Sequence, residues 1–354
     1  MREISGEPIS VLISYWYFRK DKPLQKVIEA ATEATRRGAA VRILVDSGAF
    51  SADSQGFDIP VADYAAWLRE MQDVLAPWFV GAISLDVLRD PERSWQNWRD
   101  LHRRGLDTIP VSHLHDKTDV VDRYADADCD LIALGAMVGQ SFPTKFRWAA
   151  WIHRHLRDHH PSVRTHGLGA TSQRMVDVIP WWSVDSSSFG SGFRYGTARL
   201  YDPDKRKIVQ VDVSGGVDTH RHGRLLRDVY GIDPAKIRKS NPDNRDLLLS
   251  AAARAVLLWQ ADLRKARPVP APASQHDEGT HVHAVVGPGV SSNQAFPAYL
   301  KAAVGTHIHQ VQDQGDLPHF LDKAADSTVN GPHINPVDTY ADHIAEHIKK
   351  GSTP

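Results

Sequence analysis

The chain alternates short apolar runs with longer segments in which apolar residues recur every three or four positions. The apolar runs are rich in β-branched and aromatic residues and predict strands at residues 9–18, 41–46, 79–86, 108–113, 130–135, 163–168 and 181–185. The periodic segments predict helices at residues 23–37, 60–75, 91–104, 117–126, 144–158 and 172–178. Short apolar strands that alternate with amphipathic helices are typical of parallel βαβ units.

The number of these units distinguishes between two α/β architectures. Seven or eight units within about 260 residues favour a closed barrel over an open, doubly wound sheet. No G-x-G-x-x-G motif follows the first predicted strand, which argues against a dinucleotide-binding fold. We therefore expect an α/β fold, a (β/α)8 TIM barrel formed by residues 1–266, with a C-terminal extension.

After residue 198 the chain no longer follows the alternation of apolar strands and amphipathic helices. Residues 198–213 predict a hairpin that turns at Asp202-Pro203-Asp204, and residues 244–266 predict a long helix that is a candidate for closing the barrel. Residues 267–280 have the Pro- and Ala-rich composition of a linker. Residues 281–354 are rich in histidine, and we assign this tail no role.

The composition is that of a globular protein. Of the 354 residues 42% are hydrophobic and 24% charged, enough to form a large core. No apolar run approaches the ~20 residues of a membrane span, and no basic, cleavable leader is visible, so we expect a cytoplasmic protein without membrane contact. The net charge of −1 means that nucleic-acid binding would depend on local basic runs. Such runs lie at residues 99–104, 153–164, 205–207 and 221–227.

The metal-ligating residues argue against a metal centre. Cys129 is the only cysteine, which excludes a disulfide framework and any zinc site that needs two or more thiolates. The pairs His281/His283 and His307/His309 would each face one side of a strand and could share an ion. No carboxylate or cysteine is fixed beside them, so we expect no metal and no cofactor.

Polar residues stand at the ends of several predicted strands. Asp46, Asp86 and Asp185 each close an apolar strand, and His113 closes another. A single aspartate after a strand is commonplace, because Asp also caps helices and starts turns. In a barrel, however, the carboxyl ends of all strands meet at one mouth, where catalysis takes place. The three aspartates would therefore converge.

A pair of carboxyl groups at a barrel mouth suits retaining glycosyl transfer. One carboxylate attacks the anomeric carbon, while the other protonates the leaving group and later deprotonates the incoming nucleophile. Glycines at strand ends, such as Gly135 and Gly167, would let a flat ring approach the backbone closely.

At these residues the sequence resembles the tRNA-guanine transglycosylases. Residues 46–50 (DSGAF) are similar to the family's DSGGF segment, and residues 84–86 (SLD) to its ALD segment. Residues 134–139 resemble the glycine-rich strand end that contacts the base, and Asp185 stands where the family's nucleophile follows the seventh strand. The resemblance covers about residues 9–240, and it rests on the order and spacing of motifs that are each weak alone.

The resemblance implies a role for each matching residue. Asp185 would be the nucleophile, Asp46 the general acid and base, and Asp86 the residue that binds the purine edge. His113 falls where the family has a base-binding glutamine. The substrate-binding residues implied in this way are Asp86, His113, Gly135, Ser47, Gly48, Phe50 and Gly167.

The likeness is closer to the phage and bacterial branch of this superfamily, which inserts 7-deazaguanines such as preQ0 into DNA. Residues 131–135 (LIALG), 166–169 (HGLG) and 181–186 (WWSVDS) resemble that branch. The tRNA enzymes also carry a zinc held by three cysteines and one histidine, and a Pro-Thr-Arg segment after the nucleophile. Here Cys129 stands alone, and Ser186-Ser187-Ser188 with Arg194 follow instead.

The resemblance therefore implies DNA and a 7-deazaguanine base as partners. A partner subunit or homodimer is a further candidate partner, and a partner subunit or the C-terminal tail could supply the positive surface that the near-neutral net charge lacks. Three alternatives remain open: a tRNA-modifying transglycosylase, a barrel that only binds nucleic acid or a partner, and an unrelated barrel glycosidase. Retention of both Asp46 and Asp185 counts against a pure binder, which needs neither.

Overall fold

The computed structural model describes residues 7–19, 24–186, 196–213, 217–237 and 244–266, and the backbone of 281–286. The predicted linker, the tail beyond residue 286, Ser187, Ser188 and Arg194 lie outside these residues.

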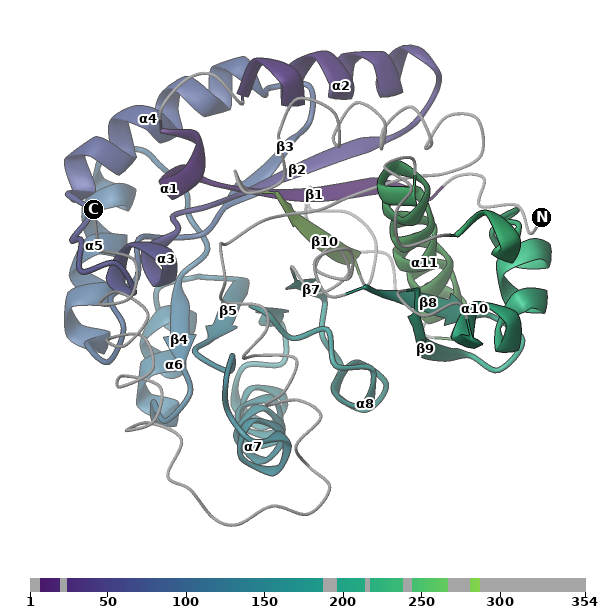
Figure 1. The fold of residues 1–354 in the computed structure, drawn as a ribbon. Coiled ribbons are helices and arrows are strands. Elements are labelled where there is room, and N and C mark those ends of the chain that lie inside the picture. Colours follow the sequence, from purple (N-terminus) through teal and green to yellow (C-terminus); the bar gives the residue numbers. More distant parts are fainter. Residues whose placement is uncertain are drawn as a thin grey trace, which may run out of the picture.

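The fold is mixed α/β and is built on an eight-stranded parallel sheet (Figure 1). The strands are β1 (Ile9–Ser14), β2 (Val41–Asp46), β3 (Phe79–Ala82), β4 (Val111–His113), β5 (Leu131–Gly135), β6 (Arg164–Gly167), β7 (Ser183–Ser186) and β10 (His281–Val286). Their order is β3-β2-β1-β10-β7-β6-β5-β4, and every pair is parallel. The prediction of parallel βαβ units is confirmed.

The two ends of this strand order are joined by a short bridge. Ile83, directly after β3, pairs in parallel with Ile109, which precedes β4. The amide of Ser84 donates to the carbonyl of Ile109 over 2.8 Å, and the amide of Ile109 donates to the carbonyl of Ala82 over 2.7 Å. The strands at the two ends of the order are therefore neighbours in space.

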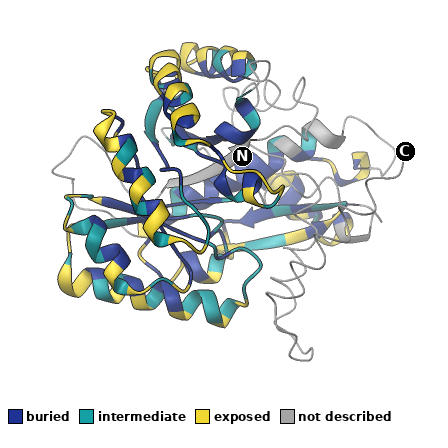
Figure 2. Cartoon of the chain, turned by 90° about the vertical axis from the view of Figure 1, so that its left-hand side faces the viewer, coloured by how far each residue is buried: buried dark blue, intermediate teal, exposed yellow. Residues whose placement is uncertain are grey.

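Helices cover the outside of the sheet, with their exposed faces turned to solvent (Figures 1 and 2). The helices between the strands are α2 (Leu24–Arg36), α4 (Val61–Val74), α5 (Pro91–Arg103), α6 (Thr118–Ala125), α7 (Phe142–His159) and α8 (Gln173–Val176). Helix α5 shows why they begin where they do, because the Asp90 carboxylate caps the amide of Arg93 and Pro91 occupies the first turn. None of the described helices has the length and apolarity needed to cross a membrane.

The core has layers on both faces of the sheet. Two large clusters lie between helices and strands, and one of them includes alternate β1 residues such as Val11 and Ile13. A third cluster brings together side chains from β1, β2, β4, β5 and the bridge: Leu12, Leu44, Ile83, Val111 and Ala133. Because alternate strand residues face opposite sides, the strands are apolar on both faces and read as continuous apolar runs.

The first predicted strand is too long. Strand β1 ends at Ser14, and residues Tyr15–Phe18 form the short helix α1. The β1–β2 pairing stops at Ser14 and Asp46, and among the described residues no strand pairs with the chain beyond Ser14. The aromatic residues there are buried in a helical turn, and burial rather than strand pairing explains their type. The helix α3 (Ala49–Asp53), directly after Asp46, was not predicted.

The later elements combine a confirmed prediction with an unexpected strand. The hairpin is present as β8 (Thr197–Asp202) paired with β9 (Lys207–Asp212), and the long helix α11 spans Asn244–Ala266. The shorter elements α10 (Val217–Arg221), a π-helical turn (Leu225–Val229) and a 3-10 turn (Pro234–Lys236) lie between them. The first six residues of the predicted tail form β10, which pairs with β1 on one side and β7 on the other. The sheet thus takes a strand from the region after the predicted linker.

Candidate active site

The three aspartates singled out from the sequence lie at the carboxyl ends of strands of the parallel sheet. Asp46 is the last residue of β2, Asp185 is the third residue of β7, and Asp86 follows β3. Their charges interact, because Asp86 raises the pKa of Asp46 and Asp46 raises the pKa of Asp185. The predicted convergence of the three carboxyl groups is therefore seen in the structure.

The backbone after β2 holds the Asp46 carboxylate. The amide of Gly48 donates to Asp46 Oδ2 over 2.9 Å. Gly48 has a φ of 72°, and a Cβ placed on it would lie 2.4 Å from Ser14 Oγ and 2.5 Å from Trp16 Cβ. Only glycine fits this left-handed and crowded position, so the turn that presents its amide to Asp46 depends on it.

Residues of strand β6 and of the turn after it hold Asp185 in place. The amide of Gly169 donates to Asp185 Oδ1 over 2.5 Å. The Nε2 atom of His166 lies 3.7 Å from the same oxygen, and the Nδ1 atom of His166 is 2.7 Å from Ser183 Oγ. Both His166 and Asp185 are buried. Asp185 is thus fixed by a backbone amide and flanked by an imidazole whose other nitrogen is tied to a hydroxyl.

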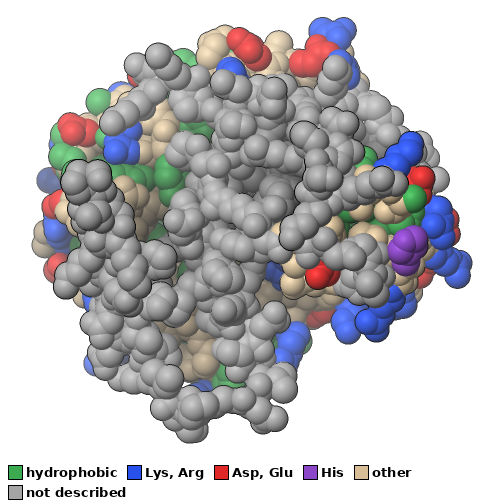
Figure 3. All heavy atoms as spheres, viewed as in Figure 1, with side chains coloured by type: hydrophobic (Ala, Val, Ile, Leu, Met, Phe, Trp, Pro, Cys, Tyr) green, Lys and Arg blue, Asp and Glu red, His purple; other side chains and the backbone are tan. Residues whose placement is uncertain are grey.

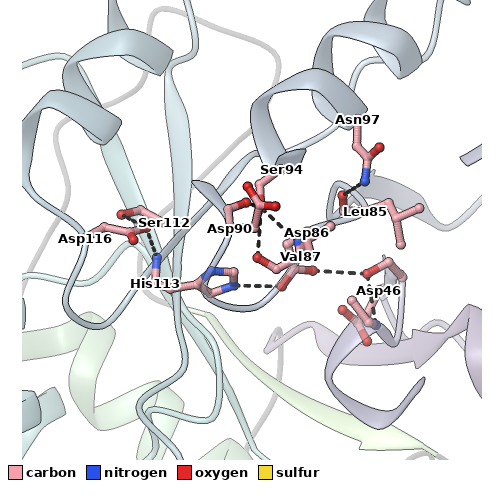
Figure 4. A network of polar contacts seen from close by, with 12 residues as sticks. Asp46, Leu85, Asp86, Val87, Asp90, Ser94, Asn97, Ser112, His113 and Asp116 are labelled. Atoms are coloured by element: carbon pink, nitrogen blue, oxygen red, sulfur yellow. Dashed lines mark hydrogen bonds and ion pairs between the residues drawn. The ribbon is translucent and has the colours of Figure 1, made fainter. Parts of the chain in front are cut away.

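Asp86 and His113 form a buried pair (Figure 4). His113 Nε2 is 2.8 Å from Asp86 Oδ2, and the Ser47 hydroxyl donates to Asp86 Oδ1 over 3.4 Å. The amide of His113 donates to Asp116 Oδ2 over 2.6 Å, which fixes the end of β4. Ser47, predicted as a substrate-binding residue, links the Asp46 turn to Asp86.

The loop that carries Asp86 is anchored on helix α5. The Asn97 side-chain amide donates to the carbonyl of Leu85 over 3.0 Å, and the amide of Val87 donates to the Ser94 hydroxyl over 2.9 Å. Figure 4 shows these contacts on either side of Asp86. A carboxylate flanked by two anchored residues has a defined direction, as a recognition group requires.

Burial changes the protonation of Asp46 and Asp185. Removal from water raises the pKa of each to about 7, since desolvation disfavours the charged form. For Asp46 the charge of Asp86 adds to this effect, and the Ser14 hydroxyl and the Gly48 and Ser47 amides oppose it. For Asp185 the Gly169 amide opposes it and the charge of Asp46 adds to it. Each carboxyl group can therefore give or take a proton near neutral pH.

The two histidines of the site differ in charge for physical reasons. Burial alone lowers the pKa of His166 to about 3, so its imidazole is neutral. Burial also lowers the pKa of His113, but the hydrogen bond and the charge of Asp86, with the charge of Asp116, outweigh it and raise the pKa above 6.5. The contact with Asp86 therefore favours the protonated form of His113.

The remaining predicted site residues lie around these groups. Phe50 is half-buried on α3. Gly135 ends β5, where an added Cβ would lie 3.3 Å from His113 Cδ2. Gly167 ends β6, where an added Cβ would lie 2.7 Å from Ala170 Cβ. Gly135 is thus beside the Asp86–His113 pair, whereas Gly167 is needed for the close packing of the turn that follows it.

The loops after three strands contain residues in the left-handed region. Arg89 follows β3 with a φ of 64°, His115 follows β4 with a φ of 83°, and Ala136 follows β5 with a φ of 56°. Such conformations cost of order 1–3 kcal/mol each for residues with a side chain, and they gather where function requires them. Here they occur at the end of the sheet that carries the aspartates.

Sequence reasoning missed His166 as a site residue. It appeared only within a segment quoted for its resemblance, residues 166–169. The available signal was a histidine inside a short buried strand directly before a Gly-x-Gly turn. A titratable side chain at that position has to face a polar partner, and in the structure these partners are Ser183 and Asp185.

The basic runs fall into two groups. At residues 99–104 and 153–164, Arg103 and Arg104 pair with Asp100, and Arg157 with Asp158. The second group is exposed on the hairpin and the elements after it, on the right-hand side of Figure 3. Its members are Lys205, Arg206, Lys207, Arg221, Arg224 and Arg227. We refer to this group as the basic surface; β9 and α10 are in contact, and two of its members are paired, Lys205 with Asp202 and Arg224 with Asp228.

No protein-family model matches the sequence, and no curated protein matches it either.

The arrangement is suited to acid–base and nucleophilic chemistry by carboxyl groups. Two aspartates with a pKa near 7 face the same end of the sheet as a third that is paired with a histidine. Within the described residues, one group has the spacing of metal ligands, and it contains none of the predicted site residues: Asp122, His155 and His160.

Proposed function

We propose that this protein is a nucleic-acid guanine transglycosylase, which exchanges guanine in DNA for a 7-deazaguanine through a covalent aspartyl intermediate. The observation that carries the proposal is the pair of carboxyl groups of Asp46 and Asp185, whose pKa values are both raised to about 7 by removal from water at one end of the sheet. The resemblance of the strand-end motifs to the guanine transglycosylases supports the choice of base and polymer.

The proposal includes a closed (β/α)8 barrel. Support comes from the parallel bridge between Ile83 and Ile109, which joins the two ends of the strand order. The third apolar cluster, with Leu12, Leu44 and Val111 from different strands, is what the side chains inside a barrel would form. In such a barrel the strand ends that carry the three aspartates surround one mouth.

The exchange needs two displacements at C1′ of the target nucleotide. Ionised Asp185 attacks C1′ and forms an ester, while protonated Asp46 transfers its proton to the departing guanine. The incoming 7-deazaguanine then gives a ring N–H proton to Asp46 as its nitrogen attacks C1′ and releases Asp185. Each half-reaction restores what the other used, so no cofactor or oxidant is required.

Asp86 is the group we assign to the base. Its carboxylate accepts from His113 and Ser47 and still has lone pairs for the N–H groups of a guanine-like edge. The positive charge favoured on His113 would complement the carboxylate of Asp86. A base without these donors would leave a buried carboxylate partly unpaired, which is costly.

The basic surface formed by the hairpin and α10 supports a polyanionic substrate. Exposed lysines and arginines attract phosphates and give binding that weakens with salt. A target base within a duplex would have to be flipped into the site, at a cost of a few kcal/mol. The lone Cys129 argues for DNA over tRNA, because the zinc-bearing region of the tRNA enzymes needs three cysteines.

The test is base exchange with labelled guanine and labelled preQ0, offered equal amounts of duplex DNA, single-stranded DNA and unmodified tRNA. We expect label to enter DNA. Asp185→Asn and Asp46→Asn should lower the rate by about 10²-fold or more, since general acid–base catalysis alone contributes typically ~10²–10⁴-fold. Asp73→Asn, an exposed aspartate on α4, is the matched control and should exchange at the wild-type rate.

The outcomes separate the alternatives. Label that enters tRNA and not DNA would support transglycosylase activity but show that the substrate is tRNA. Release of free base to water without exchange would indicate a glycosidase. If no polymer undergoes exchange but nucleic acid still binds, the protein would be a non-catalytic nucleic-acid-binding protein.

A further inference from the structure

Three ligand-type side chains gather on the outer helices. Asp122 lies on α6, His155 lies in the last turns of α7, and His160 caps that helix. His155 Nε2 is 2.5 Å and His160 Nε2 is 3.0 Å from the same oxygen, Asp122 Oδ1. The three ligand atoms lie within 4.8 Å of one another. Two imidazole nitrogens thus aim at one carboxylate oxygen.

We infer that Asp122, His155 and His160 bind a divalent transition-metal ion such as Zn²⁺. The site is separate from the three aspartates, because α7 leads into the amino end of β6 whereas Asp185 stands at the carboxyl end of the sheet. The inference is independent of the proposed function. It departs from the expectation, drawn from the sequence, that the protein holds no metal.

The end of α7 brings the second imidazole into place. On a continuing helix, His155 would be paired with His159, four residues on. His160 instead leaves the helix with φ −134° and ψ 62°, and its ring turns back to Asp122. His159 stacks on His155 at 4.3 Å and donates from Nδ1 to the His155 carbonyl over 3.0 Å. The stacking limits the directions that the His155 ring can take.

The donor set suits a borderline transition metal. Zinc takes imidazole nitrogens and carboxylate oxygens at about 2.0–2.2 Å, and tetrahedral ligands then lie roughly 3.3 Å apart. The present spacings of 2.5 and 3.0 Å need to widen by less than about 1 Å, which side-chain rotation allows. Two imidazoles with one carboxylate do not suit Mg²⁺ or Ca²⁺, which prefer all-oxygen sites.

The surroundings favour a cation with water as its remaining ligand. The side chains of His155, Asp122 and His160 are 17%, 33% and 20% exposed, so solvent reaches the site. Among the described residues, these two histidines are the ion-pair partners of Asp122, so no lysine or arginine already neutralises it. The site also lies at the carboxyl end of α7, where the helix dipole attracts positive charge.

A competing account is that the cluster only ties α6 to α7 by hydrogen bonds. Such a tie needs a proton on each imidazole nitrogen that faces Asp122, whereas a metal ion replaces those protons and makes binding stronger as pH rises. The two accounts therefore differ in zinc stoichiometry and in its pH dependence.

The experiment is calorimetric titration of ZnCl₂ into the full chain after removal of metals with a chelator, at pH 6 and pH 7.5. Asp122→Asn and His160→Gln are compared with wild type. His102→Gln, an exposed histidine on α5 outside the cluster, is the matched control. The histidines of residues 281–354 remain in every variant, so only the difference between proteins reports on the cluster.

We expect each cluster variant to lose about one equivalent of zinc relative to wild type and His102→Gln, with weaker binding at pH 6. Zinc should also raise the melting temperature of wild type more than that of either variant. Equal stoichiometry and affinity in all four proteins would overturn the inference and assign any zinc to other histidines. If circular dichroism shows that Asp122→Asn does not fold, the comparison of wild type with His160→Gln, at the end of α7, tests the inference.

Discussion

Replacing Asp185 by asparagine should make the protein more stable than wild type as the pH rises. Asparagine has nearly the shape of aspartate, and its side-chain oxygen can still accept from the Gly169 amide. It carries no charge, however, so the cost of burying a carboxylate is removed. Asp185 is 7% exposed, and burial raises its pKa from 3.8 to about 7. If the proposed function holds, the variant would lose activity while it gains stability, as is common at functional sites.

The magnitude follows from this pKa difference. An acid whose pKa is higher in the folded chain keeps its proton there while the unfolded chain releases it. The free energy of unfolding therefore falls as pH rises from about 3.8 to about 7 and then levels off. Each pKa unit is worth ~1.4 kcal/mol, and the proton difference shrinks as pH nears the folded-state pKa, so the interval from pH 5 to pH 7 costs wild type about 2 kcal/mol. The free energy of unfolding of the variant does not fall in this way, because asparagine does not ionise. The substitution also removes the repulsion between the charges of Asp185 and Asp46.

Urea unfolding followed by circular dichroism at pH 5, 6, 7 and 8 measures the effect. The difference in free energy of unfolding between Asp185→Asn and wild type should grow by about 2 kcal/mol from pH 5 to pH 7 and change little above it. In melting temperature this is about 4 °C, at ~2 °C per kcal/mol for a domain of this size. Asp73→Asn, exposed on α4, should show no such trend.

A difference that stays constant with pH, or that shrinks as pH rises, would refute the reasoning. It would mean that Asp185 ionises in the folded chain as easily as in water. The raised pKa on which its role as one of two exchanging carboxyl groups depends would then be absent. The slope with pH is decisive here, because a simple packing effect of the substitution shifts all pH values equally.

Three further outcomes test the surroundings of the aspartates. Gly48→Ala should destabilise the protein by roughly 2–4 kcal/mol in urea, because its Cβ would lie 2.4 Å from Ser14 Oγ, whereas Gly38→Ala, also left-handed but in open space, should cost only about 1 kcal/mol; equal costs would contradict the crowding. Asp86→Asn should lower the pKa of His113 measured by NMR, since burial then acts with less opposition, and an unchanged value would remove Asp86 as the cause. Asp86→Ala should raise the KM for the 7-deazaguanine and weaken discrimination among purines more than it lowers the melting temperature, and unchanged selectivity would separate Asp86 from base recognition.

The strand ends could be predicted because the information is local. The apolar run that stops at Asp46 ends opposite Ser14, the last residue of β1, whereas β7 and its pairing with β10 continue one residue beyond Asp185; parallel strands bring such ends together. The same local reasoning failed at residues 15–18, where aromatic side chains favour a strand but the described residues include no strand that pairs with them. Propensity yielded to tertiary context there.

What the sequence could not reveal depends on contacts between distant segments. The neutral state of His166 follows from its complete burial, which needs the whole core. The cluster of Asp122 with His155 and His160 requires α6 and α7 to pack side by side, although 33 residues separate Asp122 from His155. Strand β10 alternates histidine with apolar residues, but nothing local indicates that it lies between β1 and β7.

The three aspartates can lie at one end of the sheet because their environments differ: one is paired with a histidine, and the pKa values of the other two are raised. Three ionised carboxylates in a buried place would repel one another strongly, and the interior would not offset that repulsion. Asp86 is paired with His113, and the pairing raises the pKa of that histidine. Asp46 and Asp185 have no charged histidine beside them among the described residues. The cost of removing their charges from water therefore raises their pKa values to about 7. Ionising one of them makes the other hold its proton more tightly, so the state with one charge and one proton is favoured near neutral pH. That state provides one nucleophile and one acid, which is the division of roles that a double displacement requires.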